Sequence, residues 1–286
     1  MIFFTMRAGI AGWITCLLIL VFTASESLAL VAPAPEPVAI VPELIDPEFS
    51  PRLGKYYYRF QWMLRIGADA TVKIDRKDDT YEVATSVSTG WFVDRIYRLR
   101  FNGMALINAE DFSLVNADIR EEVRSSQKVS NVEHRDGVLY SERVRTKRNR
   151  NPRYQSFEHS TRGGQVTDPF SATLIARAIP WEVGDLRTID VFDGRRINRV
   201  TMECLGTARV EAIGREHDAL RIHLSITQGD PEDIEEDDEL ITDEVEVFIA
   251  ADSSREVLRI EADTKYGSIR VILEQFAPVS DEHAIP

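Results

Sequence analysis

The chain has 286 residues, of which 44% are hydrophobic and 28% charged, and its formal net charge is −13 at pH 7. These proportions are ordinary for a soluble globular protein, and the length suffices for one large all-β domain or two smaller ones. The negative charge argues against a general nucleic-acid binder, because phosphate contacts require clustered Lys and Arg. We therefore expect no nucleic-acid partner, and an acidic surface that promotes solubility or repels anionic lipid.

Residues 1–29 have the pattern of a secretory signal peptide. Arg7 precedes an apolar run from Ala8 to Phe22, and Ser27 and Ala29 are small residues of the kind that a signal peptidase reads. The run of about fifteen residues is short for a membrane span, which requires roughly twenty. The sequence predicts a periplasmic protein with no stable transmembrane segment after cleavage. The alternative is an uncleaved anchor in the inner membrane, with the chain facing the periplasm.

Residues 30–54 are rich in proline and alanine. The prolines recur from Pro33 to Pro51, and such spacing favours an extended chain without regular structure. We expect a linker here that tethers the following domain or wraps around it.

From residue 55 the apolar residues recur with a period of two. Tyr56, Tyr58 and Phe60 share one face of the first such segment, and the same alternation returns around Val72 and Val83. This pattern is typical of half-buried strands, and it continues to residue 277. The sequence predicts a mainly β domain over residues 55–277 and a C-terminal tail over residues 278–286. Roughly a dozen short strands favour a single curled antiparallel sheet or an open barrel.

Turn residues separate the predicted strands. We expect turns at Gly67–Asp69 and at residues 76–79, because glycine and clustered polar residues interrupt the alternation there. Asp136-Gly137 and Asp193-Gly194 are both two-residue hairpin signals.

One short helix interrupts the β pattern after Thr167. Asp168 suits the N-cap, Pro169 suits the first helical position, and Pro180 ends the helix. Apolar residues recur at four-residue steps from Phe170 through Leu174, so one face of the helix is apolar. A helix of about eleven residues needs tertiary packing to persist. We expect this apolar face to pack on the curled sheet.

A basic run stands out in this acidic protein. It is a candidate for contact with phosphate or carboxylate groups of an envelope component, through Arg143, Arg145, Lys147, Arg148 and Arg150. The simpler interpretation is an edge strand with its loop, since Lys and Arg protect sheet edges against pairing with other strands.

An acidic run occupies residues 229–243 and reads GDPEDIEEDDELITD. Its carboxylates would repel one another in a packed element, so we expect a mobile hairpin loop. The alternating acidic spacing and turn glycine of the common calcium loop are absent, and the sequence predicts no metal site.

Several spaced motifs together resemble the bacterial family called domain of unknown function 3108. They are YRFQWMLRIGADATVKI, TGWFVDRIYRLR, Asp168-Pro169-Phe170-Ser171, Gly184-Asp185, Val191-Phe192-Asp193-Gly194, His217-Asp218-Ala219-Leu220-Arg221, Arg259-Ile260-Glu261-Ala262 and Tyr266-Gly267-Ser268. The resemblance covers the chain from Tyr57 to Phe276. It implies an exported protein with an antiparallel, curled β fold, and it implies no particular activity. The acidic and basic runs depart from the family pattern.

No catalytic constellation is recognisable. The histidines are scattered, and there is no HExxH pair, GxSxG elbow, P-loop or dinucleotide glycine fingerprint. The sequence therefore predicts no catalytic residues and no cofactor, and it favours a non-enzymatic protein, with a hydrolase as the weaker alternative.

A binding role has more support from the residues. A curled sheet lined by aromatic and branched side chains can leave an apolar concavity, as in small barrels that carry hydrophobic ligands. The candidate lining residues are Tyr58, Phe60, Trp62, Trp91, Phe92 and Leu174. The candidate partners are a lipid or another envelope protein. If the side chains instead fill the interior completely, the protein has no pocket, and a scaffolding role in the envelope is the alternative.

Overall fold

A computed structural model describes residues 37–62, 66–95, 98–161, 166–228, 245–264 and 267–279. Within these ranges the chain forms one 16-stranded sheet. The elements in chain order are β1 (Val38–Ala39), η2 (Pro42–Leu44), β2 (Gly54–Trp62), β3 (Ile66–Lys77), β4 (Thr80–Thr89), α2 (Trp91–Asp94), β5 (Leu99–Asn108), β6 (Leu114–Val123), β7 (Ser126–Arg135), β8 (Val138–Lys147), β9 (Arg153–Ser160), β10 (Val166–Thr167), α3 (Pro169–Ala178), β11 (Leu186–Phe192), β12 (Ile197–Ala212), β13 (Arg215–Gln228), β14 (Val245–Ala250), β15 (Val257–Thr264) and β16 (Gly267–Pro278).

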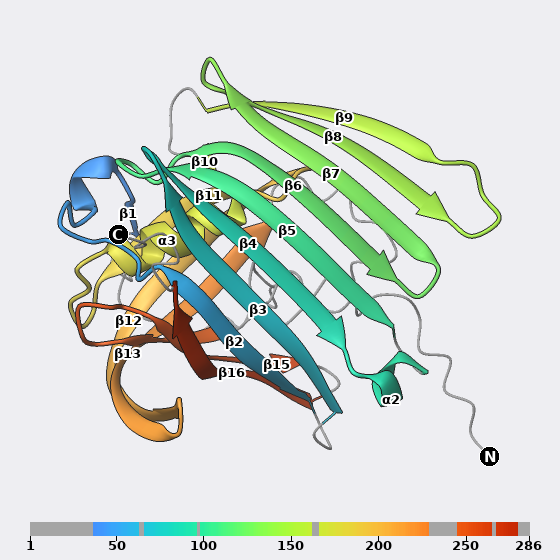
Figure 1. Ribbon diagram of the computed structural model, residues 1–286. Coiled ribbons are helices and arrows are strands. Elements are labelled where there is room, and N and C mark those ends of the chain that lie inside the picture. Colours follow the sequence, from blue (N-terminus) through green and yellow to red (C-terminus); the bar gives the residue numbers. More distant parts are fainter. Residues whose placement is uncertain are drawn as a thin grey trace, which may run out of the picture.

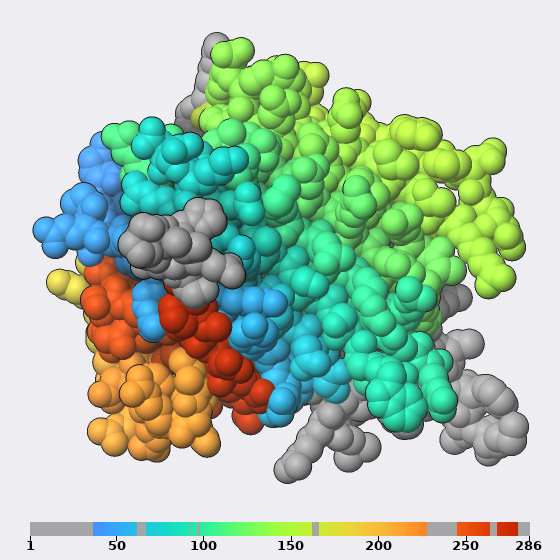
Figure 2. All heavy atoms as spheres, in the orientation of Figure 1, coloured from blue at the N-terminus to red at the C-terminus, as the bar shows by residue number. Residues whose placement is uncertain are grey.

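The sheet consists of two antiparallel wings joined by one long-range strand pair. The first wing runs from β2 to β9 and the second from β11 to β16, with each strand paired to the next along the chain. Pairing of β16 with β2 connects the wings, so the sheet order is β1, β11 to β16, then β2 to β9. Figure 1 shows the sheet curling until β12 and β13 lie behind β2 and β3, and Figure 2 shows the continuous outer face of β3 to β9. The predicted fold class is confirmed, with more strands than the sequence indicated.

The period-two pattern of the sequence coincides with burial in the sheet. In β4 the side chains of Tyr81, Val83, Thr85 and Val87 are buried, and those between them keep contact with solvent. In β2, Tyr56, Tyr58 and Phe60 are buried and the intervening Arg59 is exposed. Each wing therefore has one apolar face, and these faces meet inside the curl.

Helix α3 lies where the sequence predicts it and is capped at both ends. The Asp168 carboxylate accepts hydrogen bonds from the backbone N–H of Phe170 at 2.8 Å and of Ser171 at 3.3 Å. At the other end, Arg255 Nη1 donates to the Ala178 carbonyl at 3.0 Å, where a cation also suits the helix dipole. Leu174 is buried in the core as expected. The caps fix the helix in place inside the curl (Figure 1).

The predicted turns are confirmed at two places and wrong at two. Asp136 and Gly137 connect β7 to β8 with φ angles of 52° and 74°, the left-handed pair that a two-residue hairpin of type I′ requires. Residues 78–79 connect β3 to β4 as expected.

Gly67–Asp69, in contrast, lies within β3. The hairpin at Asp193 has a loop over residues 193–196 instead of two residues. The reason is that the Asp193 carboxylate accepts from the N–H groups of Arg195 and Arg196, each at 2.9 Å.

The predicted linker is part of the folded domain from residue 37 on. β1 pairs with β11 in parallel, and the side chains of Ile40, Ile45 and Phe49 are buried in the core. The prolines do not prevent this, since the chain wraps over the domain with only two short elements of its own. Residues 1–36, which include the predicted signal peptide, the acidic run at 229–243 and residues 280–286 of the predicted tail lie outside the described residues.

Among the described residues, none of the helices combines the length and apolar character that crossing a membrane requires.

The N-cap of α3 gives a first prediction. Asp168→Ala removes the acceptor of two buried backbone N–H groups, and we expect the free energy of unfolding to fall by about 1–2 kcal/mol. Urea denaturation measures this change. Asp168→Asn is the control, because its side-chain oxygen still accepts from the helix and the loss should be smaller. Equal stability of Asp168→Ala and the parent protein would contradict the capping role.

The same carboxyl group makes stability depend on pH. Burial raises the pKa of Asp168 above its ordinary value, against the opposing effect of the hydrogen bonds from Ser171 and Phe170. The folded state then holds a proton more tightly than the unfolded state, so this contribution is complete at low pH and is lost as pH rises through the folded pKa. The unfolding free energy of the parent minus that of Asp168→Asn should decrease as pH rises from about 4. A difference that stays constant across a pH series of urea titrations would refute this.

Candidate functional site

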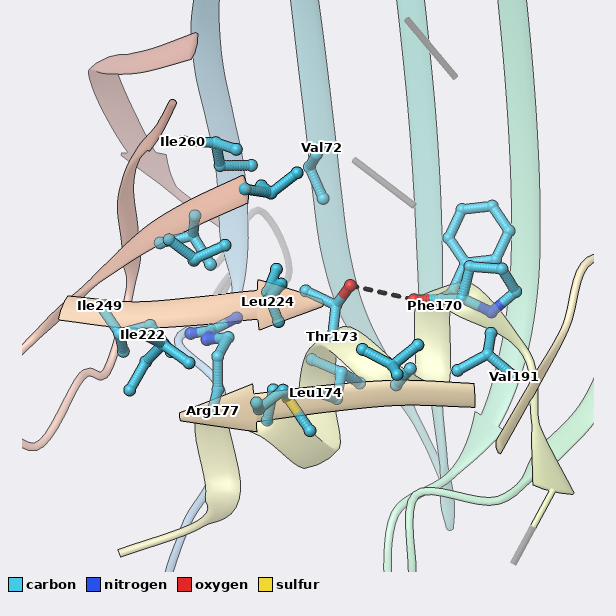
Figure 3. A pocket seen from close by; sticks show the side chains of 18 of the residues that line it. Val72, Phe170, Thr173, Leu174, Arg177, Val191, Ile222, Leu224, Ile249 and Ile260 are labelled. Atoms are coloured by element: carbon cyan, nitrogen blue, oxygen red, sulfur yellow. Dashed lines mark hydrogen bonds between the residues drawn. The ribbon is translucent and has the colours of Figure 1, made fainter. Parts of the chain in front are cut away.

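An apolar cavity lies between the two wings, with α3 in its wall. Its volume is about 140 Å³, and it is lined from β2, β3, β4, α3 and the strands β11 to β15. Figure 3 shows these side chains converging on one space. For scale, an engineered apolar cavity of roughly 150 Å³ stays dry and binds benzene. The interior of the curl is therefore not completely filled, and its free space suits a ring or one short acyl chain.

Alternate residues of the strands supply the apolar lining. On β13 these are Ile222, Leu224 and Ile226, and the neighbouring β14 contributes Val245, Val247 and Ile249. Because side chains of a strand alternate between the two faces, the period-two pattern that buries the core also lines this space. Leu224 and Val247 keep some accessible surface, as expected of side chains around a space that they do not fill.

Helix α3 forms the wall opposite these strands. One face of the helix lines the cavity through Phe170, Thr173, Leu174 and Arg177. Thr173 and Leu174 lie three and four residues after Phe170, and Arg177 lies one further turn along the same face. The Thr173 hydroxyl donates to the Pro169 carbonyl at 2.9 Å, the dashed line in Figure 3. That hydroxyl is thus bound within the helix, and the wall stays mainly apolar apart from Arg177.

Arg177 brings a buried charge to one end of the cavity. It is only 4% exposed, and its Nε donates to the Arg255 carbonyl at 2.8 Å and its Nη2 to the Ser254 carbonyl at 3.1 Å. Both carbonyls belong to the turn between β14 and β15. Among the described residues that line the cavity, Arg177 is the sole charged one.

Two tyrosines lie close to Arg177. The Tyr58 hydroxyl donates to the Val257 carbonyl at 3.0 Å, and the Tyr56 hydroxyl donates to the Arg52 carbonyl at 2.7 Å. Burial raises the pKa of both tyrosines, and the positive charge of Arg177 acts in the opposite direction. Both hydroxyls are therefore protonated at neutral pH, with their hydrogens committed to backbone carbonyls.

Two carboxylates near this end are each paired with another arginine. Glu256 is buried and accepts from Arg52 Nη1 at 3.0 Å. Asp46 accepts from Arg255 Nη2 at 2.7 Å. The charges of these two pairs cancel, and Arg177 forms no ion pair of its own among the described residues.

The predicted lining residues divide into four groups. Tyr58 and Leu174 line the cavity, whereas Phe60 is buried on the same strand face as Tyr58 without being among the lining residues. Trp91 is 74% exposed, so its predicted place in the lining is wrong. The short helix α2 carries it outward, and the Arg95 guanidinium lies 5.3 Å from its ring centroid. The side chains of Trp62 and Phe92 are not among those that the structure describes.

The basic run divides between a strand and a loop. Arg143, Arg145 and Lys147 share one face of β8, and Arg148 and Arg150 are exposed in the loop before β9. β9 ends the sheet order, so the run lies beside a sheet edge, the position that the edge-protection interpretation expects. Contact of these five residues with an anion stays a prediction.

Sequence reasoning missed Arg177 and the strands opposite the helix. Arg177 does carry a signal, because it lies three residues after Leu174 and thus on the apolar face of the predicted helix. The contribution of β13 and β14 had no such signal, since alternation does not show which distant strands face a helix.

Side chains that bind metals do not cluster in the described part of the chain. No group of three or more His, Cys, Asp or Glu side chains that could hold a metal occurs there. Cys204 is buried and forms no disulfide, and burial raises the pKa of its thiol. The arrangement of the cavity supports binding of an apolar group.

A solved structure of another protein has a similar fold. The β-barrel-like protein of domain of unknown function DUF1849 from Brucella abortus is 9% identical and has a TM-score of 0.55, with 81% of this chain and 100% of that chain covered. This likeness concerns the fold alone.

Two further structures are much less similar. A putative exported protein with a YmcC-like fold from Bacteroides fragilis is 7% identical, covers 80% of this chain and 98% of that chain, and has a TM-score of 0.32. Lipoprotein LppX from Mycobacterium tuberculosis is 12% identical, with 80% and 89% covered and a TM-score of 0.23. These scores are too low to bear on fold or function.

No curated protein matches the chain in sequence. A family model does match, that of the proteins of unknown function DUF3108, and it spans residues 55–274. This range contains α3, the cavity lining and both wings of the sheet except the first residue of β2 and the end of β16. The chain belongs to the DUF3108 family.

Proposed function

We propose that this protein is an exported, non-enzymatic protein of the cell envelope that binds an apolar, lipid-like ligand in the cavity beside α3. The observation that carries the proposal is the unfilled apolar space of about 140 Å³. At about 24 cal/mol per Å³, an empty cavity of this size costs about 3 kcal/mol of stability. That is a substantial share of the roughly 5–15 kcal/mol by which a domain is stable. A ligand that fills the space recovers this loss.

The chemistry of the lining decides the class of ligand. The strand residues around the cavity are mostly Val, Ile and Leu, and transfer of each methylene from water to such surroundings is favourable by about 0.8 kcal/mol. Hydroxyls of Tyr58 and Thr173 donate to backbone carbonyls, so they leave little hydrogen-bonding capacity for a sugar or a peptide. An acyl chain or a small ring system fits these properties best.

Export rests on the sequence of residues 1–29, and the periplasm is the proposed compartment. A scaffolding protein of the envelope without a ligand is the alternative function. It requires the same export but no occupant of the cavity, so binding experiments separate the two.

The export proposal predicts the N-terminus of the mature protein. When the full-length gene is expressed in its native host, we expect the protein in the periplasmic fraction to begin at Leu30, because the small Ser27 and Ala29 precede that bond. N-terminal sequencing after fractionation measures this. A chain that retains residues 1–29 in the membrane fraction would favour the anchored alternative, and a cytoplasmic chain would refute export.

The binding proposal predicts that 1-octanol occupies the cavity, as measured by isothermal titration calorimetry of delipidated protein. Leu224→Trp places an indole in the space and should weaken binding at least ten-fold. It should leave the protein folded, since the ring enters free volume. Leu205→Trp is the matched control. It is a leucine on the adjacent β12 that is 40% exposed, and its replacement should leave binding unchanged.

Two outcomes would count against the cavity as a binding site. If 1-octanol does not bind the parent protein, the scaffolding alternative is favoured. If Leu224→Trp is strongly destabilised, in the manner of an overpacked core, the interior is filled in solution.

A further inference from the structure

We propose that Arg177 binds the anionic head group of an amphipathic acid, a fatty-acid-like molecule whose tail fills the cavity. This inference rests on the proposed function and adds to it the chemical class of the ligand. It assigns the polar end of the ligand to the turn between β14 and β15 and the apolar end to the space beside Phe170.

The hydrogen bonding of Arg177 leaves donors for a ligand. A guanidinium carries five N–H groups. Its Nε and Nη2 donate to neutral backbone carbonyls, and its side chain also interacts with the Tyr56 hydroxyl. In Figure 3 the side chain extends from α3 among the apolar residues that line the cavity. Arg177 is thus a buried cation that faces an apolar space with part of its donor capacity unused.

The energetics of burial favour an anion at this position. Removing a charged side chain from water costs several kcal/mol unless an opposite charge offsets it. No ion pair of Arg177 occurs among the described residues, and the nearby Glu256 and Asp46 are paired with Arg52 and Arg255. A carboxylate or phosphate at the end of the cavity would supply the missing counter-charge and could accept two parallel hydrogen bonds.

A purely structural role for Arg177 explains less. Its two hydrogen bonds tie α3 to the turn at Ser254 and Arg255, but Arg255 already makes the same connection by donating to Ala178 and pairing with Asp46. A neutral donor would serve the carbonyl bonds without the desolvation cost of a charge. The Phe49 and Tyr56 rings, whose centroids lie 5.6 Å and 6.0 Å from the guanidinium carbon, stabilise this charge in part. An anionic ligand would supply the full counter-charge.

The dimensions of the helix face set the size of the ligand. Arg177 and Phe170 are seven residues apart, which corresponds to about 10 Å along a helix. Both side chains line the cavity. A head group at Arg177 therefore leaves room for an acyl chain of moderate length that ends near Phe170, in keeping with the volume of the space.

The test compares octanoate with 1-octanol, which have the same chain length and differ in the head group. We expect calorimetry at pH 7 to show octanoate binding at least ten-fold more tightly to the parent protein. The net charge of −13 works against this preference, so only a local positive site can produce it. In Arg177→Gln we expect octanoate binding to weaken at least ten-fold, so that its preference over 1-octanol disappears, while 1-octanol binding is retained. Arg199→Gln, which removes an exposed arginine paired with Asp190 on the sheet surface, is the matched control and should keep the preference.

The outcomes separate this inference from the proposed function. Binding of 1-octanol without a preference for octanoate in the parent protein would overturn the role of Arg177 and leave the apolar site standing. Failure of both probes to bind would overturn the proposed function itself. If Arg177→Gln does not fold, Arg177→Lys replaces it as the variant, because it keeps the charge and should retain part of the preference. The ratio of octanoate affinity to 1-octanol affinity in the parent protein tests the inference without any variant.

Discussion

The pairing of β2 with β16 is the constraint on which the rest of the structure depends. It joins the beginning of the domain to its end, with Tyr58 opposite Leu273 and Phe60 opposite Val271. Without this pair the two wings would be separate meanders, each with one apolar face exposed to water. With it, the sheet curls and the two faces enclose an interior that one short helix has to complete. Among the described strands, this pair joins the residues that are most distant in sequence. Because such contacts carry a loop-closure cost, the interior depends on a strongly non-local pairing.

The position of α3 follows from its caps, and the cavity follows from its position. Asp168 holds the first turn and Arg255 holds the last carbonyls, so the helix cannot slide along the sheet to improve packing. Its wall residues Thr173 and Ala172 are small, and the facing strands contribute branched side chains that do not reach across. The packing of the helix on these strands leaves a space of about 140 Å³ unfilled. This persistence against a stability cost favours a binding role over a packing defect.

Sequence reasoning predicts the local features of the fold. It fails for features that depend on contacts between segments distant in the sequence. Alternation identified β2 to β4, and capping residues identified α3 with its ends, because these signals lie within a few residues of one another. It missed β6 and β7, where charged residues such as Arg120 and Lys128 occur on strands beside few buried side chains. The burial of Ile40 and the exposure of Trp91 depend on how their segments lie against the rest of the domain. The cavity forms because β13 and α3 lie opposite each other, and no local sequence pattern predicts that arrangement.

The negative surface charge of the protein and the buried charge of Arg177 act on different kinds of anion. At physiological ionic strength, exposed charges are screened beyond about 8 Å, so the carboxylates scattered over the surface repel a long polyanion that must approach many of them. A small acid inside the curl meets instead the low dielectric around Arg177, where a single charge acts with little screening. The expectation from net charge that nucleic acid is not a partner therefore does not extend to small anionic ligands. The chemistry of one buried side chain decides the head group, and the length of the helix face behind it decides the tail.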